Sequence, residues 1–322
     1  MSDMKEVVPF YYSSSGNPQE DKILLEPIKY VLQCLDTHPC RKLLSIFNYW
    51  FKVSPDKFQL IDEIIQMAFS TCVLIFLYIY IKFLFFDRFD DIQDEAIIRN
   101  GFPVAHSVCG LHNSINAANY LQFIICEKLI NLHPMAIKIF IEQSMEYYKG
   151  QGMDLYWKEN FICPTEKDYN ILASRKSSWL MKIMVKLLKL FSTYEKDLLS
   201  LVDTMGLYRQ IYDDYYNLRH NKTNENSYCD DLTEGKMSFL IIHALRNNPD
   251  DKKIINILRQ RSKNIEVKRY CIKILENYGS FKYAKDVLDK LEKKLRTEID
   301  RLGGNPLFEQ LMDDLSMLKI RA

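Results

Sequence analysis

The sequence predicts an all-α protein, a helical bundle around a large core. From Leu24 onward, apolar residues recur at intervals of three and four, the spacing of helices that bury one face. Only 10 glycines and 10 prolines accompany 48% hydrophobic residues, so disordered, collagen-like and glycine-rich all-β chains are excluded. Because 43 Lys and Arg residues balance 42 Asp and Glu residues, we expect no nucleic-acid partner.

The elements follow in order along the chain. Residues 1–21 are mostly polar and contain the turn-forming run Ser13–Gly16, which predicts a flexible tail before a single domain at 22–322. Periodic apolar segments then lie at 24–35, 57–69, 116–130, 135–148, 178–191 and 196–218. Breaks are expected at 37–39, 55, 101–103, 163–164, 221–226 and 303–306. The pattern predicts about a dozen helices with short connections.

One segment, Phe69–Phe86, is apolar over 18 residues except for Lys82. This length approaches the roughly 20 residues of a membrane-spanning helix, so membrane association is one interpretation. The other is a central helix of the bundle that is buried on every side, and we favour it because the run leads directly into an acidic motif. The eight cysteines are dispersed without zinc-ligand spacing, and no targeting segment is evident, so we expect a cytoplasmic protein with reduced thiols.

The strongest chemical signal is the motif DDIQD at residues 90–94. On a helix, Asp90 and Asp94 share one face and Asp91 lies beside them, so the first two can chelate a hard cation together. Mg²⁺ favours such carboxylates and completes its coordination shell with water and substrate phosphates. A solvated helix face is the alternative interpretation of the same motif.

A second acidic motif, DDYYN, places Asp213, Asp214 and Asn217 in a strongly apolar helix. Asp213 and Asn217 are four residues apart and therefore share one helix face. Two such motifs on facing helices would form a Mg²⁺ clamp around a diphosphate. Basic residues that could neutralise phosphate oxygens are Arg99, Lys176 and Lys236.

This combination of groups supports the ionisation of an allylic diphosphate. Departure of diphosphate leaves a delocalised carbocation, while Mg²⁺, lysine and arginine stabilise the charge that develops on the leaving group. The protein must also exclude water from the cation. The substrate expected from this chemistry is an allylic prenyl diphosphate.

The sequence resembles the trans-isoprenyl diphosphate synthase family over about residues 23–318, and within it the animal geranylgeranyl diphosphate synthases. The motifs that carry the resemblance include DDIQD (90–94), NGFPVAHSVCG (100–110), GQGMDLYW (150–157), DDYYN (213–217), DLTEGK (231–236) and RLGGNP (301–306). The resemblance implies an isoprenoid synthase bundle around a deep cavity, with the Mg²⁺-bound diphosphate at its mouth. We further expect a homodimer or a higher homo-oligomer.

The resemblance also assigns roles to individual residues. Asp90, Asp94 and Asp213 would hold Mg²⁺, and Asp91, Asp214 and Asn217 complete the two catalytic motifs. The residues expected to contact the allylic diphosphate are Arg99, Lys176, Ser177, Gln210 and Lys236. A further family lysine is replaced by Asn226, which puts that contact in doubt.

The family's site for the second substrate, isopentenyl diphosphate, is altered. Its usual lysine, arginine, histidine and arginine are replaced by Thr37, Cys40, Phe69 and Asn100, respectively. Arg41 is a possible substitute, but one step along a helix is a rotation of about 100°. Each lost charge-assisted hydrogen bond is worth roughly 1.5–3 kcal/mol, so we expect weak binding of isopentenyl diphosphate.

Two enzymatic interpretations follow from this pattern. A terpene synthase, as in the insect branch derived from this family, would ionise the allylic substrate and let the cation lose a proton, cyclise or capture water. A prenyltransferase, the geranylgeranyl diphosphate synthase, would still couple isopentenyl diphosphate. A non-catalytic subunit and a faulty gene sequence are the non-enzymatic alternatives, and we favour the terpene synthase.

Relative to the family, about 14 residues at 76–89 are inserted before DDIQD, equal to about 3.9 helical turns and 21 Å. Three interpretations follow: the insert forms a bulge outside the helix, the helix before it is shifted along its axis, or the insert is absent from the functional protein. In a continuous helix, Phe85 and Phe86 would form the floor of the prenyl cavity and favour a C10 or C15 chain. In a looped-out insert, Thr71 and Cys72 would leave room for C20.

Overall fold

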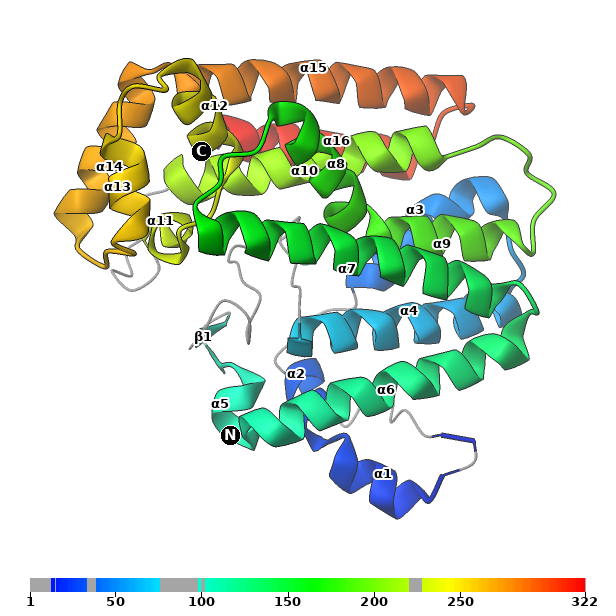
Figure 1. Cartoon of the computed structure of the whole chain (residues 1–322). Coiled ribbons are helices and arrows are strands. Elements are labelled where there is room, and N and C mark those ends of the chain that lie inside the picture. The colour runs from blue at the N-terminus through cyan, green and yellow to red at the C-terminus, as the bar shows by residue number, and fades with distance from the viewer. Residues whose placement is uncertain are drawn as a thin grey trace, which may run out of the picture. The chain divides into compact units, whose positions relative to one another are not determined.

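The computed structural model describes residues 13–14, 16–33, 39–75, 98–99, 102–219 and 228–321. In these ranges the chain forms sixteen helices and one antiparallel pair of two-residue strands. The prediction of an all-α protein is confirmed (Figure 1).

The elements of the first half of the chain are α1 (Pro18–Leu24), α2 (Glu26–Gln33), α3 (Pro39–Phe51), α4 (Pro55–Ile75), β1 (Ile98–Arg99), β2 (Phe102–Pro103), α5 (Ala105–Cys109), α6 (Leu111–Leu132) and α7 (Ala136–Asn160). Those of the second half are α8 (Glu166–Ser177), α9 (Trp179–Lys189), α10 (Leu199–Arg219), α11 (Asp230–Glu234), α12 (Phe239–Asn247), α13 (Lys253–Arg259), α14 (Ile265–Asn277), α15 (Ser280–Arg301) and α16 (Pro306–Arg321).

The chain divides into two compact units, and the first comprises the residues up to Ile141 together with Ile183–Tyr194. Its core forms where α4 packs along α6, with α2 and α3 against α4 (Figure 1). Ile61 and Ile65 of α4 and Leu121 and Ile125 of α6 are fully buried. Their spacing of four residues is the periodicity that the sequence displays, since positions four apart lie on one helix face.

The first helix begins earlier than the sequence suggests. A flexible tail was expected to end at residue 21, but α1 begins at Pro18, where proline is favoured and where the side chain of Asn17 accepts from the backbone N–H of Gln19. Asp21 is buried and accepts hydrogen bonds from the N–H of Ser13 at 3.0 Å and the hydroxyl of Tyr120 at 2.5 Å. The expected boundary therefore falls inside a helix that is anchored to α6.

The second unit comprises Glu142–Lys182 and the residues from Glu195 onward, and α10 is its central helix. Helices α15, α8 and α12 pack around α10 (Figure 1). Leu288, Leu295 and Ile299 of α15 are fully buried. Because α10 is covered on most sides, polar residues within it must find partners inside the protein.

Close approach of α10 to the junction between α8 and α9 depends on Gly206. A Cβ atom at this position would lie 2.0 Å from Oγ of Ser178 and 2.9 Å from its backbone nitrogen. Any larger side chain would force the two elements apart. The glycine thereby brings α10 against the end of α8, where two of the expected site residues lie.

Most of the expected helix breaks agree with the structure. Helices α3, α4 and α16 begin at Pro39, Pro55 and Pro306, and α8 begins shortly after Pro164. The number of helices exceeds the expected dozen, in part because short interruptions at Leu25 and Gly110 separate helices where no break was expected.

The expected apolar helix at Phe69–Phe86 is described only up to Ile75, where α4 ends, and the rest of that run lies outside the described residues. Within the described ranges, no helix is long and apolar enough to cross a membrane. The six cysteines whose side chains the structure describes are free thiols.

Candidate active site

The second acidic motif lies on α10, where its three polar residues have different environments. The side chain of Asp213 is 20% exposed, and its Oδ2 accepts from the guanidinium of the buried Arg209 at 3.2 Å. The side chain of Asp214 is 0% exposed, and Asn217 is also buried. Of the three groups, only the Asp213 carboxylate is thus reachable from solvent.

The two oxygens of Asp214 are divided between two sets of donors. Oδ1 accepts from Nζ of Lys236 at 2.9 Å and from Nε2 of Gln210 at 3.4 Å. Oδ2 accepts from the hydroxyl of Tyr169 and from the backbone N–H of Phe239, both at 2.7 Å. This carboxylate therefore organises α8, α10 and the start of α12, and has no oxygen left for a metal ion.

Each of the two expected lysines is paired with a carboxylate. Nζ of Lys176 lies 2.6 Å from Oδ2 of Asp154 on α7, and Nζ of Lys236 lies 3.6 Å from Oδ1 of Asp231 in addition to its contact with Asp214. Burial acts to raise the pKa of Asp154, but the positive charges of Lys176 and Lys236 outweigh it and hold this pKa below its ordinary value. Both ammonium groups therefore act on one carboxylate and belong to one charged network.

Ser177 and Gln210 join α8 to α10 beside these lysines. Oγ of Ser177 donates to Oε1 of Gln210 at 2.5 Å, and Gln210 in turn donates to Asp214. Oδ1 of Asn217 accepts from the backbone N–H of Asp231 at 3.3 Å. The structure thus brings together the expected residues of α8, α10 and the DLTEGK segment.

The first acidic motif cannot be compared with this arrangement. Asp90, Asp91 and Asp94 lie outside the described residues, and Arg99 is described only by its backbone, in β1. Among the described side chains, no group of three or more His, Cys, Asp or Glu residues could hold a metal ion. The roles assigned to these residues stay predictions.

Three members of the network have no assigned role in the sequence analysis: Tyr169, Asp154 and Asp231. Asp154 and Asp231 belong to motifs of the resemblance, but nothing in local spacing pairs a residue with a partner 22 or 45 positions away. The signal in the sequence that could have identified these residues is a charged or phenolic side chain on an otherwise apolar helix face. Such a side chain needs a hydrogen-bond or ion-pair partner once it is buried.

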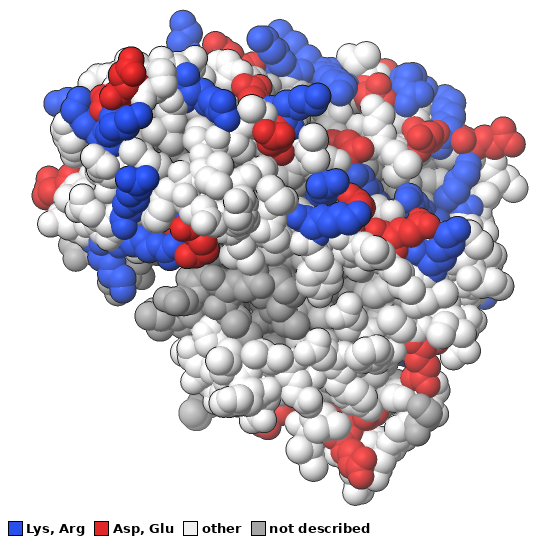
Figure 2. Space-filling view, in the orientation of Figure 1, with Lys and Arg blue, Asp and Glu red and all other residues white. Residues whose placement is uncertain are grey.

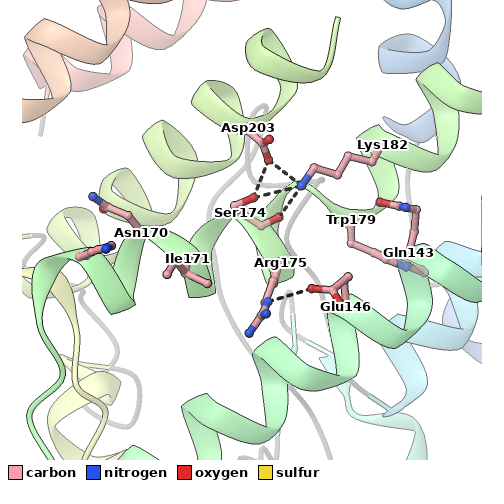
Figure 3. A pocket seen from close by; sticks show the side chains of 10 residues that line it. Gln143, Glu146, Asn170, Ile171, Ser174, Arg175, Trp179, Lys182 and Asp203 are labelled. Carbon is pink, nitrogen blue, oxygen red and sulfur yellow. Dashed lines mark hydrogen bonds and ion pairs between the residues drawn. The ribbon is translucent and has the colours of Figure 1, made fainter.

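A cavity of about 460 Å³ is lined by residues of α7, α8, α9 and α10 (Figure 3). It is lined by Gln143, Glu146, Lys167, Asn170, Ile171, Ser174, Arg175, Trp179, Lys182 and Asp203. Here Arg175 pairs with Glu146 at 2.9 Å, and Lys182 pairs with Asp203 at 2.6 Å. No expected site residue lines this cavity, so it is distinct from the lysine and aspartate network.

The polyprenyl synthetase family model matches residues 30–275, which is more than half of the chain. The chain belongs to the polyprenyl synthetase family. It is 44% identical over 305 residues to a terpene synthase from Matsumurasca onukii, covering 94% of this chain and 96% of that relative.

Geranylgeranyl pyrophosphate synthases are also similar. One from Aspergillus flavus is 38% identical over 94% of this chain and 86% of its own length. Another, from Mucor circinelloides f. lusitanicus, is 35% identical over 94% of this chain and 97% of its own length. The resemblance to trans-isoprenyl diphosphate synthases is confirmed, and this polyprenyl synthetase family member is an enzyme.

Family members bind diphosphate through divalent metal ions, so the fit of such an ion to the described residues can be tested. The partly exposed carboxylate of Asp213 is a hard oxygen ligand that suits Mg²⁺. Asp214 does not fit this role because both of its oxygens accept hydrogen bonds, and Oδ1 of Asn217 is engaged with Asp231.

In this family member, two of the positions expected to be altered in the co-substrate site lie among the described residues of the first unit. Cys40 of α3 and Phe69 of α4 are both buried in its core. Arg41 lies 3.2 Å from Oδ2 of the buried Asp62, which also accepts from Nε2 of Gln66. Thr37 and Asn100 lie outside the described residues.

Proposed function

We propose that this enzyme is a terpene synthase that ionises an allylic prenyl diphosphate without using isopentenyl diphosphate. The observation that carries the proposal is the contrast between two sets of side chains. The residues expected to hold the allylic diphosphate form a connected charged network around Lys176, Lys236 and Asp214. At two of the positions where the family uses basic residues for the second substrate, the side chains are the buried, uncharged Cys40 and Phe69.

The reaction begins with heterolytic cleavage of the allylic C–O bond, whose electron pair leaves with the diphosphate oxygen. Lys176 and Lys236 would hold that diphosphate by charge-assisted hydrogen bonds, and their carboxylate partners orient them beforehand. Mg²⁺ held by Asp90, Asp94 and Asp213 would neutralise further charge on the leaving group. The hydroxyl of Ser177 and the amide of Gln210 complete the polar lining.

Arg41, the possible substitute for the lost arginine, has another partner. Its guanidinium pairs with Asp62, a buried carboxylate whose charge needs compensation. Using Arg41 for a second diphosphate would leave that carboxylate with less compensating charge. This competition supports a chemistry in which the cation loses a proton, cyclises or captures water rather than meeting isopentenyl diphosphate.

A geranylgeranyl diphosphate synthase is the second candidate, favoured by the similarity to the enzymes of Aspergillus flavus and Mucor circinelloides f. lusitanicus. This enzyme would have to bind isopentenyl diphosphate through cations elsewhere, because the four positions at which the family has basic residues carry uncharged ones: Thr37, Cys40, Phe69 and Asn100. The two candidates share the allylic half of the reaction and differ only in the fate of the cation.

Binding of isopentenyl diphosphate separates these candidates directly. With the allylic site saturated by farnesyl thiolodiphosphate and Mg²⁺, calorimetric titration is expected to detect binding of isopentenyl diphosphate at least about 100-fold weaker than that of the thiolodiphosphate, because two lost cations suffice for that factor. A ternary complex of comparable affinity would favour the prenyltransferase. The same titration without thiolodiphosphate controls for entry of isopentenyl diphosphate into the allylic site.

We also infer that the enzyme forms a homodimer through an exposed apolar stripe on α6. This stripe contains Phe123, 71% exposed, and Ile130, 62% exposed, which lie seven residues apart and so share a face. The surface around α6 in Figure 2 carries few charged side chains, and a formal net charge of +1 does not oppose self-association.

Light scattering after size-exclusion chromatography tests this assignment. The wild-type enzyme is expected at twice the mass of one chain, and Phe123→Glu at the mass of one chain, because the buried carboxylate would lack a partner in the interface. Tyr270→Glu, which also replaces an exposed aromatic residue but on α14, is the matched control and should remain dimeric. A monomeric wild-type enzyme would contradict the assignment.

A further inference from the structure

Tyr169 occupies an interior position on α8, seven residues before Lys176. The residue is 2% exposed, and its ring lies 5.3 Å from that of Phe239, measured between centroids. Its hydroxyl donates to Oδ2 of Asp214 at 2.7 Å. The side chain therefore touches a carboxylate of the site network from the side opposite to Lys236.

Each carboxylate oxygen of Asp214 accepts hydrogen bonds from a separate pair of donors. Tyr169 and the backbone N–H of Phe239 occupy Oδ2, whereas Lys236 and Gln210 occupy Oδ1. Because two donors hold Oδ2, the carboxylate group is restrained from rotating about the Cβ–Cγ bond of Asp214. That rotation determines where Oδ1, and with it the ammonium group of Lys236, is held.

We infer that Tyr169 is a positioning residue for Lys236: its hydroxyl fixes the orientation of Asp214, which in turn directs the ammonium group at the diphosphate of the substrate. The inference rests on the proposed function, since it takes Lys236 as a diphosphate ligand. Tyr169 itself is not a catalytic residue, because it acts through Asp214.

The hydroxyl is suited to this role across the working pH range. Burial, followed by the negative charge of Asp214, raises the pKa of Tyr169 well above its ordinary value, so the group remains a hydrogen-bond donor. Lys236 in turn needs such guidance, because lysine is a point charge on a flexible stem. A second carboxylate oxygen, Oδ1 of Asp231, lies 3.6 Å from its Nζ. Once Asp214 can rotate, the ammonium group is expected to spend more time near Asp231.

Tyr169→Phe removes the hydroxyl and keeps the ring that packs on Phe239. The probe is inorganic pyrophosphate, titrated calorimetrically into the whole protein at a fixed Mg²⁺ concentration. Tyr169→Phe is expected to weaken pyrophosphate binding by roughly 10- to 150-fold, the factor associated with loss of one hydrogen bond to a charged group. Lys236→Met is expected to weaken binding by at least as much.

The double variant distinguishes positioning from a general structural role. Because Tyr169 acts through Lys236, adding Tyr169→Phe to Lys236→Met should cause little further loss of pyrophosphate affinity. Tyr208→Phe is the matched control, since Tyr208 is equally buried and its hydroxyl has no hydrogen-bond partner among the described residues. This control should bind pyrophosphate as the wild-type protein does.

Unchanged pyrophosphate affinity in Tyr169→Phe would overturn the inference. An equal loss of affinity when Tyr169→Phe is introduced into the wild-type protein and into Lys236→Met would also overturn it, because a purely structural role produces that result. Full affinity in Lys236→Met would reject the proposed role of Lys236 and the inference with it. Should Tyr169→Phe fail to fold, Asp214→Asn carries the same test, because it keeps the side-chain volume and removes the charge that holds Lys236. It is then expected to show the same non-additive loss with Lys236→Met.

Discussion

Asp213→Asn is expected to lower the rate of diphosphate release by at least about 100-fold, the scale associated with loss of one major electrostatic contribution to a transition state. Asn keeps the shape and one oxygen of the side chain but removes the charge that suits it to Mg²⁺. Asp213 is the partly exposed carboxylate of its motif, so no neighbour on α10 can replace it. The measurement is release of inorganic pyrophosphate from farnesyl diphosphate.

Asp203→Asn provides the matched control for this substitution. Asp203 also lies on α10, but it pairs with Lys182 at the cavity of Figure 3, which no residue of the lysine and aspartate network lines. Its replacement should change the rate by less than about twofold, since exposed ion pairs contribute little. Equal losses in the two variants would show that charge on α10, rather than the position of Asp213, determines the rate.

Lys176→Met is expected to reduce both stability and substrate binding. Removing one partner of a buried ion pair typically costs about 3–5 kcal/mol, because the remaining charge stays desolvated. Here that charge is Asp154, whose oxygen lies 2.6 Å from Nζ of Lys176. Chemical denaturation measures the loss of stability, and pyrophosphate titration measures the loss of affinity. Lys182→Met, which breaks a more exposed pair, should cost no more than about 1 kcal/mol.

The pH dependence of the effect of Lys176→Met on stability follows from the direction of the pKa of Asp154. In the wild-type protein this pKa is lowered, so the carboxylate contributes stability above the unfolded pKa of about 4, and that contribution is lost as the pH falls through the folded value. Without Lys176 the folded pKa rises, so the variant gains protons on acidification. The stability difference between the two proteins should therefore narrow as the pH falls.

The second variant, Lys176→Met with Asp154→Asn, separates stability from binding. Neutralising both members of the pair should recover most of the lost stability, since no buried charge remains without a partner. Pyrophosphate affinity should stay low, because the cation is still missing. Recovery of affinity in the double variant would contradict the role of Lys176 as a diphosphate ligand.

Helices of this enzyme were predictable where periodicity and capping agree. Residues of α4 and α6 such as Ile61 and Leu121 repeat at helical spacing, and Pro55 and Pro306 mark helix starts that the structure places at the same residues. The apolar segment that begins at residue 178 also agrees with the start of α9 at Trp179, but no local signal in the sequence reports the close approach of Gly206 to Ser178 from another helix. Such long-range contacts determine how the helices pack and are not visible in local propensity.

For the candidate site, the sequence predicted residues that the structure brings together, but it did not predict how they are organised. Lys176, Lys236 and Asp214 were identified from motifs, and the structure brings them into one network. No pattern in the sequence indicates that Asp214 is fully enclosed by donors, since two of these donors are the hydroxyl of Tyr169 and the backbone N–H of Phe239. Identical neighbours in a motif, Asp213 and Asp214, thus have separate roles that depend on which helix face is covered.

A product assay tests the central claim most directly. The purified enzyme is incubated with Mg²⁺ and geranyl, farnesyl or geranylgeranyl diphosphate, with and without isopentenyl diphosphate, and analysed for hydrocarbons, alcohols and longer diphosphates. The account predicts a terpene from at least one allylic substrate in the absence of isopentenyl diphosphate, with Asp213→Asn as the inactive control. Longer diphosphates that form only when isopentenyl diphosphate is present, with no terpene in its absence, would contradict it.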